Sequence, residues 1–354
     1  MWERDENIWL PTLEIMITLN ELSTHLRNRQ SSKIIFIAVA VTILLLAILL
    51  KLADFDRLIN SIATINVAFV LLSFLIFLLM IIIVSFRLLF LLHLSLKKEF
   101  IPSLDINIIH TVLLCILPAR LGDVCYPFLL NKNLNITISH SFVNLLVLRL
   151  YDFMVSAILF LFSTITLSIN TADKLILQKT ALFLFIITIC IFGAIKYFSL
   201  VHFIPKKYRN KSVRMKRIIG ILCQLQEGFH VINIVDHIIL FIMTCIKWIL
   251  SIGVIYFIFK SLNMDILATE TILVTTGMSL VVALPIQAVG GFGITEAAMA
   301  LLLGLIGYAT DVAVSYSLAT RFIWLAMPLS VGIIWLLLRN TVLINSTDQT
   351  KNTV

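Results

Sequence analysis

The chain has 354 residues, of which 60% are hydrophobic and only 13% are charged. A water-soluble fold of this length cannot hide so much apolar surface, so the composition predicts an integral membrane protein and excludes a soluble enzyme. The net charge of +8 gathers mainly in one basic segment between apolar runs, which favours membrane topology and anionic lipid over nucleic acid.

The first 32 residues are mixed and largely polar, and we expect them to stay cytoplasmic without a cleavable export signal. Within residues 1–32, Ile15, Leu19, Leu22 and Leu26 recur at helical spacing. This spacing predicts a short amphipathic helix on the membrane surface.

Six apolar runs then follow that meet or approach the length of a membrane span, which is about 20 residues. Basic residues at every second junction place both termini on the cytoplasmic side of a bacterial-type cytoplasmic membrane. The six predicted spans cover residues 34–50, 67–86, 141–168, 180–198, 238–259 and 312–338.

Two shorter apolar segments, 106–117 and 124–130, flank a polar break at residues 118–123. Neither segment can cross alone, so we predict a re-entrant hairpin that enters from the cytoplasm with its tip shielded by other helices. The alternative is one tilted span, kinked by Pro118, with Asp123 at the membrane surface.

A second break follows the apolar segment 272–284 and precedes another at 297–308. It predicts a second hairpin, entered from the outer side. Two full spans in place of this hairpin would leave the C-terminus on the same side of the membrane, so the charge pattern does not decide between the two arrangements. The predicted fold is therefore all-α and polytopic, with about six full spans plus two re-entrant hairpins or up to eight spans, over residues 33–340. A polar C-terminal tail, 341–354, follows.

The two breaks resemble each other, which indicates an internal repeat. Each reads Leu-Pro, then glycine, then an acid, and an arginine follows the acid: Asp123 precedes Arg149 by 26 residues, and Glu296 precedes Arg321 by 25. Hairpins that enter from opposite sides would make this an inverted repeat, as in many transporters. Coincidence within an apolar sequence is the alternative. The halves are 33–200 and 218–340, joined by the basic loop 205–217 and an interfacial linker helix over 218–229.

Charged residues at membrane depth are the candidate site. Each buried ion costs at least about 2.5–3.5 kcal/mol, so it needs a partner or a task. We expect Asp123 or Glu296 to pair with Arg149 or Arg321 around a polar cavity at the middle of the membrane. Alternatively, Arg149 and Asp152, three residues apart on one helix face, simply neutralise each other.

The glycine-rich turn before residue 294 has two interpretations. Its N–H groups and the following helix N-terminus suit a phosphate, which Arg120 would clamp from the other tip. Alternatively, the glycines permit close helix packing. Lys247 is a phosphate contact, a counter-ion of Glu296 or a snorkelling lysine. The predicted lipid-binding residues are Pro118, Arg120, Gly122, Asp123, Arg149, Asp152, Lys247, Pro285, Gly290, Gly291, Gly293, Glu296 and Arg321.

Catalytic signatures do not emerge from the sequence. It shows neither a P-loop nor a nucleophile with an oriented base, and its five cysteines and seven histidines are scattered. We therefore expect no disulfide, metal or cofactor, and no ATP hydrolysis.

Together these motifs resemble the flippase-like family typified by the transmembrane region of bacterial lysylphosphatidylglycerol synthases. The resemblance covers nearly all of residues 33–340. Asp123 replaces the glutamate that is commoner in the first family motif. The matching elements are Pro118 with Arg120, Gly122 and Asp123; Arg149 with Asp152; Pro285 through Glu296; and Arg321 with Pro328 and Gly332.

This resemblance implies a module that moves a phospholipid or another anionic, polyprenyl- or lipid-linked amphiphile between leaflets. Only some fifteen residues follow Arg339, so the aminoacyl-transferase domain of the full synthases is expected to be missing. Membrane lipids with anionic headgroups, and a separate lipid-modifying enzyme, are the expected partners. The rival interpretations are an integral membrane enzyme or an accessory subunit in envelope lipid or glycolipid biosynthesis.

Overall fold

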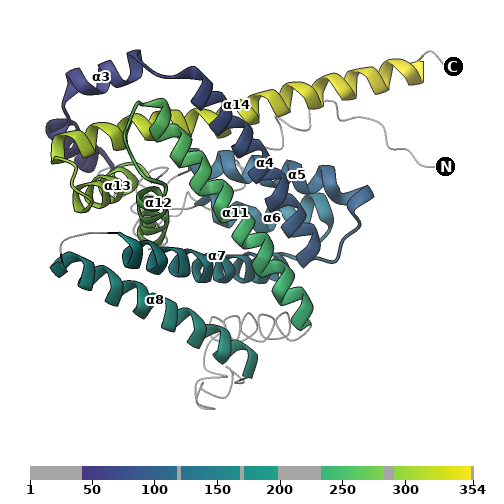
Figure 1. The fold of residues 1–354 in the computed structure, drawn as a ribbon. Helices are drawn as coiled ribbons and strands as arrows, with labels where there is room; N and C mark the ends of the chain where they lie inside the picture. The colour runs from purple at the N-terminus through teal and green to yellow at the C-terminus, as the bar shows by residue number, and fades with distance from the viewer. Residues whose placement is uncertain (1–41, 118–120, 168–170, 198–232, 283–290, 352–354) are drawn as a thin grey trace, which may run out of the picture.

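The computed structural model describes residues 42–117, 121–167, 171–197, 233–282 and 291–351, and all regular secondary structure among them is helical (Figure 1). The amphipathic helix predicted within 1–32, the basic loop 205–217 and the linker helix 218–229 lie outside these residues. The helices are a segment Thr42–Leu52, α3 (Phe55–Ala63), α4 (Val67–Leu91), α5 (Leu96–Ile116), α6 (Leu121–Leu134), α7 (Ile138–Thr166), α8 (Thr171–Tyr197), α11 (Ile234–Ser261), α12 (Ala268–Val282), α13 (Ile294–Leu305) and α14 (Thr310–Lys351).

Six described helices are long and apolar enough to span a membrane, which confirms the polytopic all-α fold. Their membership differs from the prediction at one place. The described part of the first predicted span, 34–50, belongs to the shorter helix Thr42–Leu52, whereas α5 is long enough to cross. The six are α4, α5, α7, the part of α8 over Lys174–Ile191, α11 and the part of α14 over Thr310–Arg339.

The arm before the first break is longer than predicted, because α5 begins at Leu96 and not at residue 106. The polar residue Ser103 and the charged residue Asp105 precede residue 106 and make the sequence look interrupted there. In the structure both are buried: the Ser103 hydroxyl donates to the Ser85 carbonyl at 3.1 Å, and Asp105 accepts from Nε1 of Trp335 on α14 at 2.8 Å. Polar groups satisfied by a neighbouring helix do not end a span, so the short-arm prediction was wrong here.

The second break lies between two helices whose described parts are each too short to cross. The described part of α12 has 15 residues and α13 has 12, against the roughly 20 that a span requires. After the first break, α6 is similarly short, with 14 residues. Re-entry of these helices, and the side from which they enter, stays a prediction.

Helices α4 and α11 lie against each other and run in opposite directions (Figure 1). The N–H of Asn66, which caps the start of α4, donates to the carbonyl of Ser261 at the end of α11 at 2.8 Å. Further along the same two helices, the hydroxyl of Ser73 on α4 donates to the Val254 carbonyl on α11 at 2.9 Å. The side chain of Arg87, near the end of α4, donates to Thr244 in the first half of α11.

The two halves repeat the same packing scheme. When α4, α5, α6 and α7 are matched with α11, α12, α13 and α14, the contact of α5 with α6 corresponds to that of α12 with α13, and α6 with α7 corresponds to α13 with α14. Likewise, α5 packs on α14 and α12 packs on α7. The spacing of the acid and arginine residues indicates a duplication, and the antiparallel packing of the matched helices α4 and α11 fits the predicted inverted repeat.

Large apolar side chains divide between a core and an outer surface. Phe77, Ile258, Leu273 and Leu303 are fully buried where α4, α11, α12 and α13 meet. Many others on α4, α8, α11 and α14 are exposed, which suits a surface that faces lipid. The last helix extends through the predicted polar tail as far as Lys351.

Candidate functional site

A cavity of about 290 Å³ lies where the two halves meet. Its lining comes from α5, α6 and α7 of the first half and from α11, α12, α13 and α14 of the second. Asp152 is residue 15 of the 29 in α7, and Lys247 is residue 14 of the 28 in α11. Since both residues stand halfway along a membrane-spanning helix, the cavity lies near the middle of the spans.

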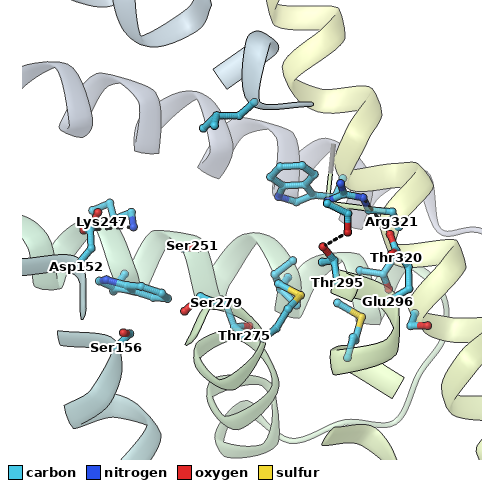
Figure 2. A pocket seen from close by; sticks show the side chains of 18 of the residues that line it. Asp152, Ser156, Lys247, Ser251, Thr275, Ser279, Thr295, Glu296, Thr320 and Arg321 are labelled. Carbon is cyan, nitrogen blue, oxygen red and sulfur yellow. Dashed lines mark hydrogen bonds and ion pairs between the residues drawn. The ribbon is translucent and has the colours of Figure 1, made fainter. Parts of the chain in front are cut away.

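Charged side chains mark two ends of this cavity (Figure 2). Asp152 and Lys247 lie on one side of the view, Glu296 and Arg321 on the other, and Thr275 appears between them. The cavity therefore offers ions at both ends and a less strongly polar middle.

Glu296 and Arg321 form the charged end in the second half. Glu296 stands in the first turn of α13 and is 1% exposed, and its Oε1 lies 3.1 Å from the Nε of Arg321 on α14. The Arg321 guanidinium also lies over the rings of Phe292 and Trp324, at 4.8 and 5.0 Å from their centroids. Aromatic faces on the guanidinium and a carboxylate at its edge hold the arginine in place.

The N-terminus of α13 holds an anion supplied by the protein itself. The N–H of Gly293 donates to Oε2 of Glu296 at 2.6 Å, so the Glu296 carboxylate occupies the position in which the sequence suggested a phosphate. Gly291 and Gly293 have φ of 76° and 86°, a left-handed conformation that favours glycine. A Cβ on Gly293 would also lie 2.5 Å from Cβ of Leu45, so this glycine permits close helix packing.

Asp123 and Arg149 form the equivalent pair in the first half. An Oδ1 of Asp123 on α6 accepts from Nη2 of Arg149 on α7 at 2.5 Å. The same oxygen lies 3.2 Å from Nε2 of His110 on α5. The ring of His110 in turn packs against Tyr126, with centroids 4.7 Å apart. Three consecutive helices are thereby joined around the first break.

Asp152 lies next to cations from two other helices. Arg87 on α4 donates to both of its carboxylate oxygens, at 2.7 and 3.3 Å, and Lys247 Nζ lies 3.4 Å from Oδ1. Arg149 and Asp152 therefore do not simply neutralise each other, because each has a direct partner elsewhere. Lys247 faces Asp152 and not Glu296, with its Nζ 4.3 Å from the centroid of the Trp248 ring.

Most of the predicted lipid-binding residues that the structure describes lie together around the cavity. Gly122 instead lies at a helix contact, since a Cβ there would be 2.8 Å from the backbone nitrogen of Leu114. Pro118, Arg120, Pro285 and Gly290 lie outside the described residues. Those that line the cavity are Asp123, Arg149, Asp152, Lys247, Gly291, Glu296 and Arg321.

Sequence reasoning missed Arg87 and His110. Arg87 directly follows the predicted span 67–86, and its position beside an apolar run was the available signal. His110 had no distinguishing neighbour in the sequence. Another missed cluster joins α5 to α14: Asp105 accepts from Nε1 of Trp335 at 2.8 Å and from Arg339 at 2.9 and 3.1 Å.

Comparison with known proteins supplies a family. The sequence profile described as the lysylphosphatidylglycerol synthase TM region matches residues 35–332. The UPF0104 membrane protein MJ1078 of Methanocaldococcus jannaschii is 28% identical over 195 residues, which cover 54% of this chain and 78% of that protein. The profile match over residues 35–332 contains both breaks and the charged residues that line the cavity.

Proposed function

This chain belongs to the lysylphosphatidylglycerol synthase TM-region family of membrane proteins, and from that membership we propose that it binds the phosphorylated headgroup of an anionic lipid in the central cavity and moves the lipid between leaflets without ATP hydrolysis. The acyl chains stay in the surrounding lipid.

One observation carries this proposal: ions from both halves meet in one cavity halfway along the spans. Arg149, Lys247 and Arg321 line the cavity, and Arg87 lies against its Asp152. Among the described residues these four cations face three carboxylates, those of Asp123, Asp152 and Glu296, which leaves an excess of one positive charge there. A buried site with this balance favours an anionic ligand.

The inverted arrangement supports movement in addition to binding. Each half places an acid–arginine pair beside its helix break, and in transporters a site at the interface of inverted repeats is opened alternately to the two sides. A headgroup held by cations at both ends exchanges one set of partners for the other as the halves rock. The driving force in this proposal is the lipid gradient itself.

The proposal extends to the surroundings of the protein. The chain works in a cytoplasmic membrane with both termini in the cytoplasm, and it serves a separate enzyme that modifies or consumes the lipid. The family description names a transmembrane region, and it supports a role outside catalysis.

Proteoliposomes with labelled anionic lipid test this function. The purified protein should accelerate transbilayer movement of the lipid, and Arg149→Ala should slow that movement. The elution and the unfolding transition of the variant should show that it is still folded. Arg57→Ala is the matched control, because Arg57 is exposed and pairs with Asp54 away from the cavity. If Arg149→Ala leaves the acceleration unchanged, the proposed mechanism is wrong. A chemically altered lipid in the mass spectrum would favour an enzyme, and movement only with a co-purified transferase would favour an accessory subunit.

A further inference from the structure

His110 is a buried ionisable side chain that the proposed function does not use. It is residue 15 of the 21 in α5 and is 9% exposed. With a rise of about 1.5 Å per residue, it lies roughly 20 Å along the helix axis from Leu96, deep within a span. Ionisable residues at such depth are costly, and chains of acidic and histidine side chains in membrane proteins carry protons. His110 is therefore a candidate proton carrier.

His110 is connected to the central cavity through Asp123. Its Nε2 lies 3.2 Å from Oδ1 of Asp123, and the same oxygen accepts from Nη2 of Arg149 at 2.5 Å. Asp123 and Arg149 line the cavity, whereas His110 does not. A proton that enters the cavity therefore reaches the imidazole by way of the Asp123 carboxylate.

The charge of His110 depends mainly on Asp123 and Arg149. The helices packed against α5 are α4, α6 and α14. On α6, Asp123 contacts His110 directly and Tyr126 packs against its ring, while Arg149 of α7 acts on it through the shared oxygen. Lys132 and Asp311 are exposed at helix ends. The arginines of α4 and α14 pair with other carboxylates: Arg87 with Asp152, Arg321 with Glu296 and Arg339 with Asp105.

Phosphate binding changes the partners of the Asp123 carboxylate. In the proposed function Arg149 holds the lipid phosphate, so it gives up part of its contact with Asp123. A buried carboxylate that loses a cation is strongly destabilised. A proton on His110 supplies a cation to the same oxygen through a charge-assisted hydrogen bond. When the phosphate leaves, Arg149 returns to Asp123 and repels the imidazolium, which then loses its proton.

We infer that the protein is a lipid–proton symporter in which His110 carries the proton. The imidazole takes up one proton from the side on which the lipid enters and releases it on the side on which the lipid leaves. Histidine suits this task because its charge changes between about pH 5 and 8. The inference rests on the proposed function and adds the proton gradient to the lipid gradient as a driving force. A singly charged headgroup and one proton cross together without net charge.

Proteoliposomes with a trace of labelled phosphatidylglycerol and a pH difference across the membrane test this coupling. With the interior one unit more alkaline, the label should accumulate in the inner leaflet up to about tenfold above protein-free liposomes, the ratio that one proton per lipid supports for each pH unit. With equal pH, the label should spread evenly. A potassium diffusion potential at equal pH should leave this even distribution unchanged, because lipid and proton together carry no net charge.

Two histidine variants assign the proton to His110. His110→Gln keeps an amide donor for Asp123 but cannot take up a proton, so accumulation should fall to the background of protein-free liposomes. Movement at equal pH should continue severalfold more slowly, because no proton replaces Arg149 on Asp123. His140→Gln is the matched control, since His140 is exposed at the start of α7 and does not line the cavity. It should accumulate the label as the unaltered protein does.

The outcomes separate the coupling from lipid movement itself. If the unaltered protein moves the label but leaves it evenly distributed at every pH difference, the inference is overturned and the proposed function stands; this outcome needs no variant. Accumulation that His110→Gln retains would also overturn the inference, because another group would then carry the proton. If the unaltered protein moves no lipid at any pH, the proposed function is contradicted and the inference fails with it.

Discussion

Glu296 and Arg321 form a 3.1 Å ion pair between α13 and α14 with almost no exposed surface. The same relationship occurs between Asp123 of α6 and Arg149 of α7, at 2.5 Å. Each inverted half thus joins the helix that follows its break to the next long span through an acid and an arginine. The pair in the second half is the more deeply buried, so its removal has the larger effect on folding.

Removing Arg321 should destabilise the protein. Arg321→Ala leaves the Glu296 carboxylate buried beside an apolar gap, and the loss of one partner of a buried pair costs about 3–5 kcal/mol. The midpoint of thermal unfolding in detergent should fall accordingly. The double variant Glu296→Gln with Arg321→Met should regain much of that stability without regaining lipid movement. Recovery of both would mean that the pair only supports the fold.

Lys247→Met should separate binding from folding. Asp152 keeps its two hydrogen bonds to Arg87, so no carboxylate is left unpaired and the unfolding midpoint should change little. The site loses one cation, and a hydrogen bond to a charged group is worth about 1.5–3 kcal/mol, so the apparent affinity for an anionic lipid should fall roughly tenfold or more. Titration of lipid movement against lipid content measures this affinity. An unchanged titration would mean that Lys247 pairs with Asp152 and does not bind the lipid.

Gly122→Ala and Gly304→Ala form a matched pair that tests the contact between the two arms at the first break. A Cβ on Gly122 meets backbone atoms of Leu113 and Leu114 at 2.8–3.0 Å, whereas one on Gly304 meets no described atom within 4 Å. The first change should therefore cost about 1–3 kcal/mol through overpacking, and the second should be neutral or gain up to about 1 kcal/mol. Thermal unfolding of both variants checks the difference, and equal midpoints would mean that α5 and α6 are not in close contact at Gly122.

Trp335→Phe should affect stability but not lipid movement. The indole of Trp335 donates to Asp105 at 2.8 Å, and Asp105 keeps both contacts with Arg339 after the change. The loss of one buried hydrogen bond is worth about 1 kcal/mol. None of the three residues lines the cavity, so a large loss of lipid movement in a folded Trp335→Phe protein would show that this cluster takes part in transport.

Much of the fold followed from apolar run lengths and from two similar breaks. The lengths of α7 and α11 and the pairing of an acid with an arginine in each half were predictable because membrane spans need a fixed apolar length and buried charges need partners. The extent of α5 was not, because Ser103 and Asp105 look like interruptions until neighbouring helices supply their partners.

The partners of Asp152 were also beyond the sequence. Arg149 stands three residues away on the same helix, yet the direct partner is Arg87, 65 residues earlier, which lies nearby because α4 and α7 both pack on α11. The glycine turn was similarly ambiguous, since a nest for phosphate and a nest for the protein's own carboxylate have the same sequence. The position of Glu296, three residues after Gly293, was the signal for the second.

An experimental density map of the protein in lipid nanodiscs tests the central claim most directly. A lipid phosphate should appear inside the cavity, within hydrogen-bonding distance of at least two of Arg149, Lys247 and Arg321, with its acyl chains directed toward the bilayer. An ordered lipid only on the outer surface, with these three side chains held by Asp123, Asp152 and Glu296 around a closed space, would contradict it.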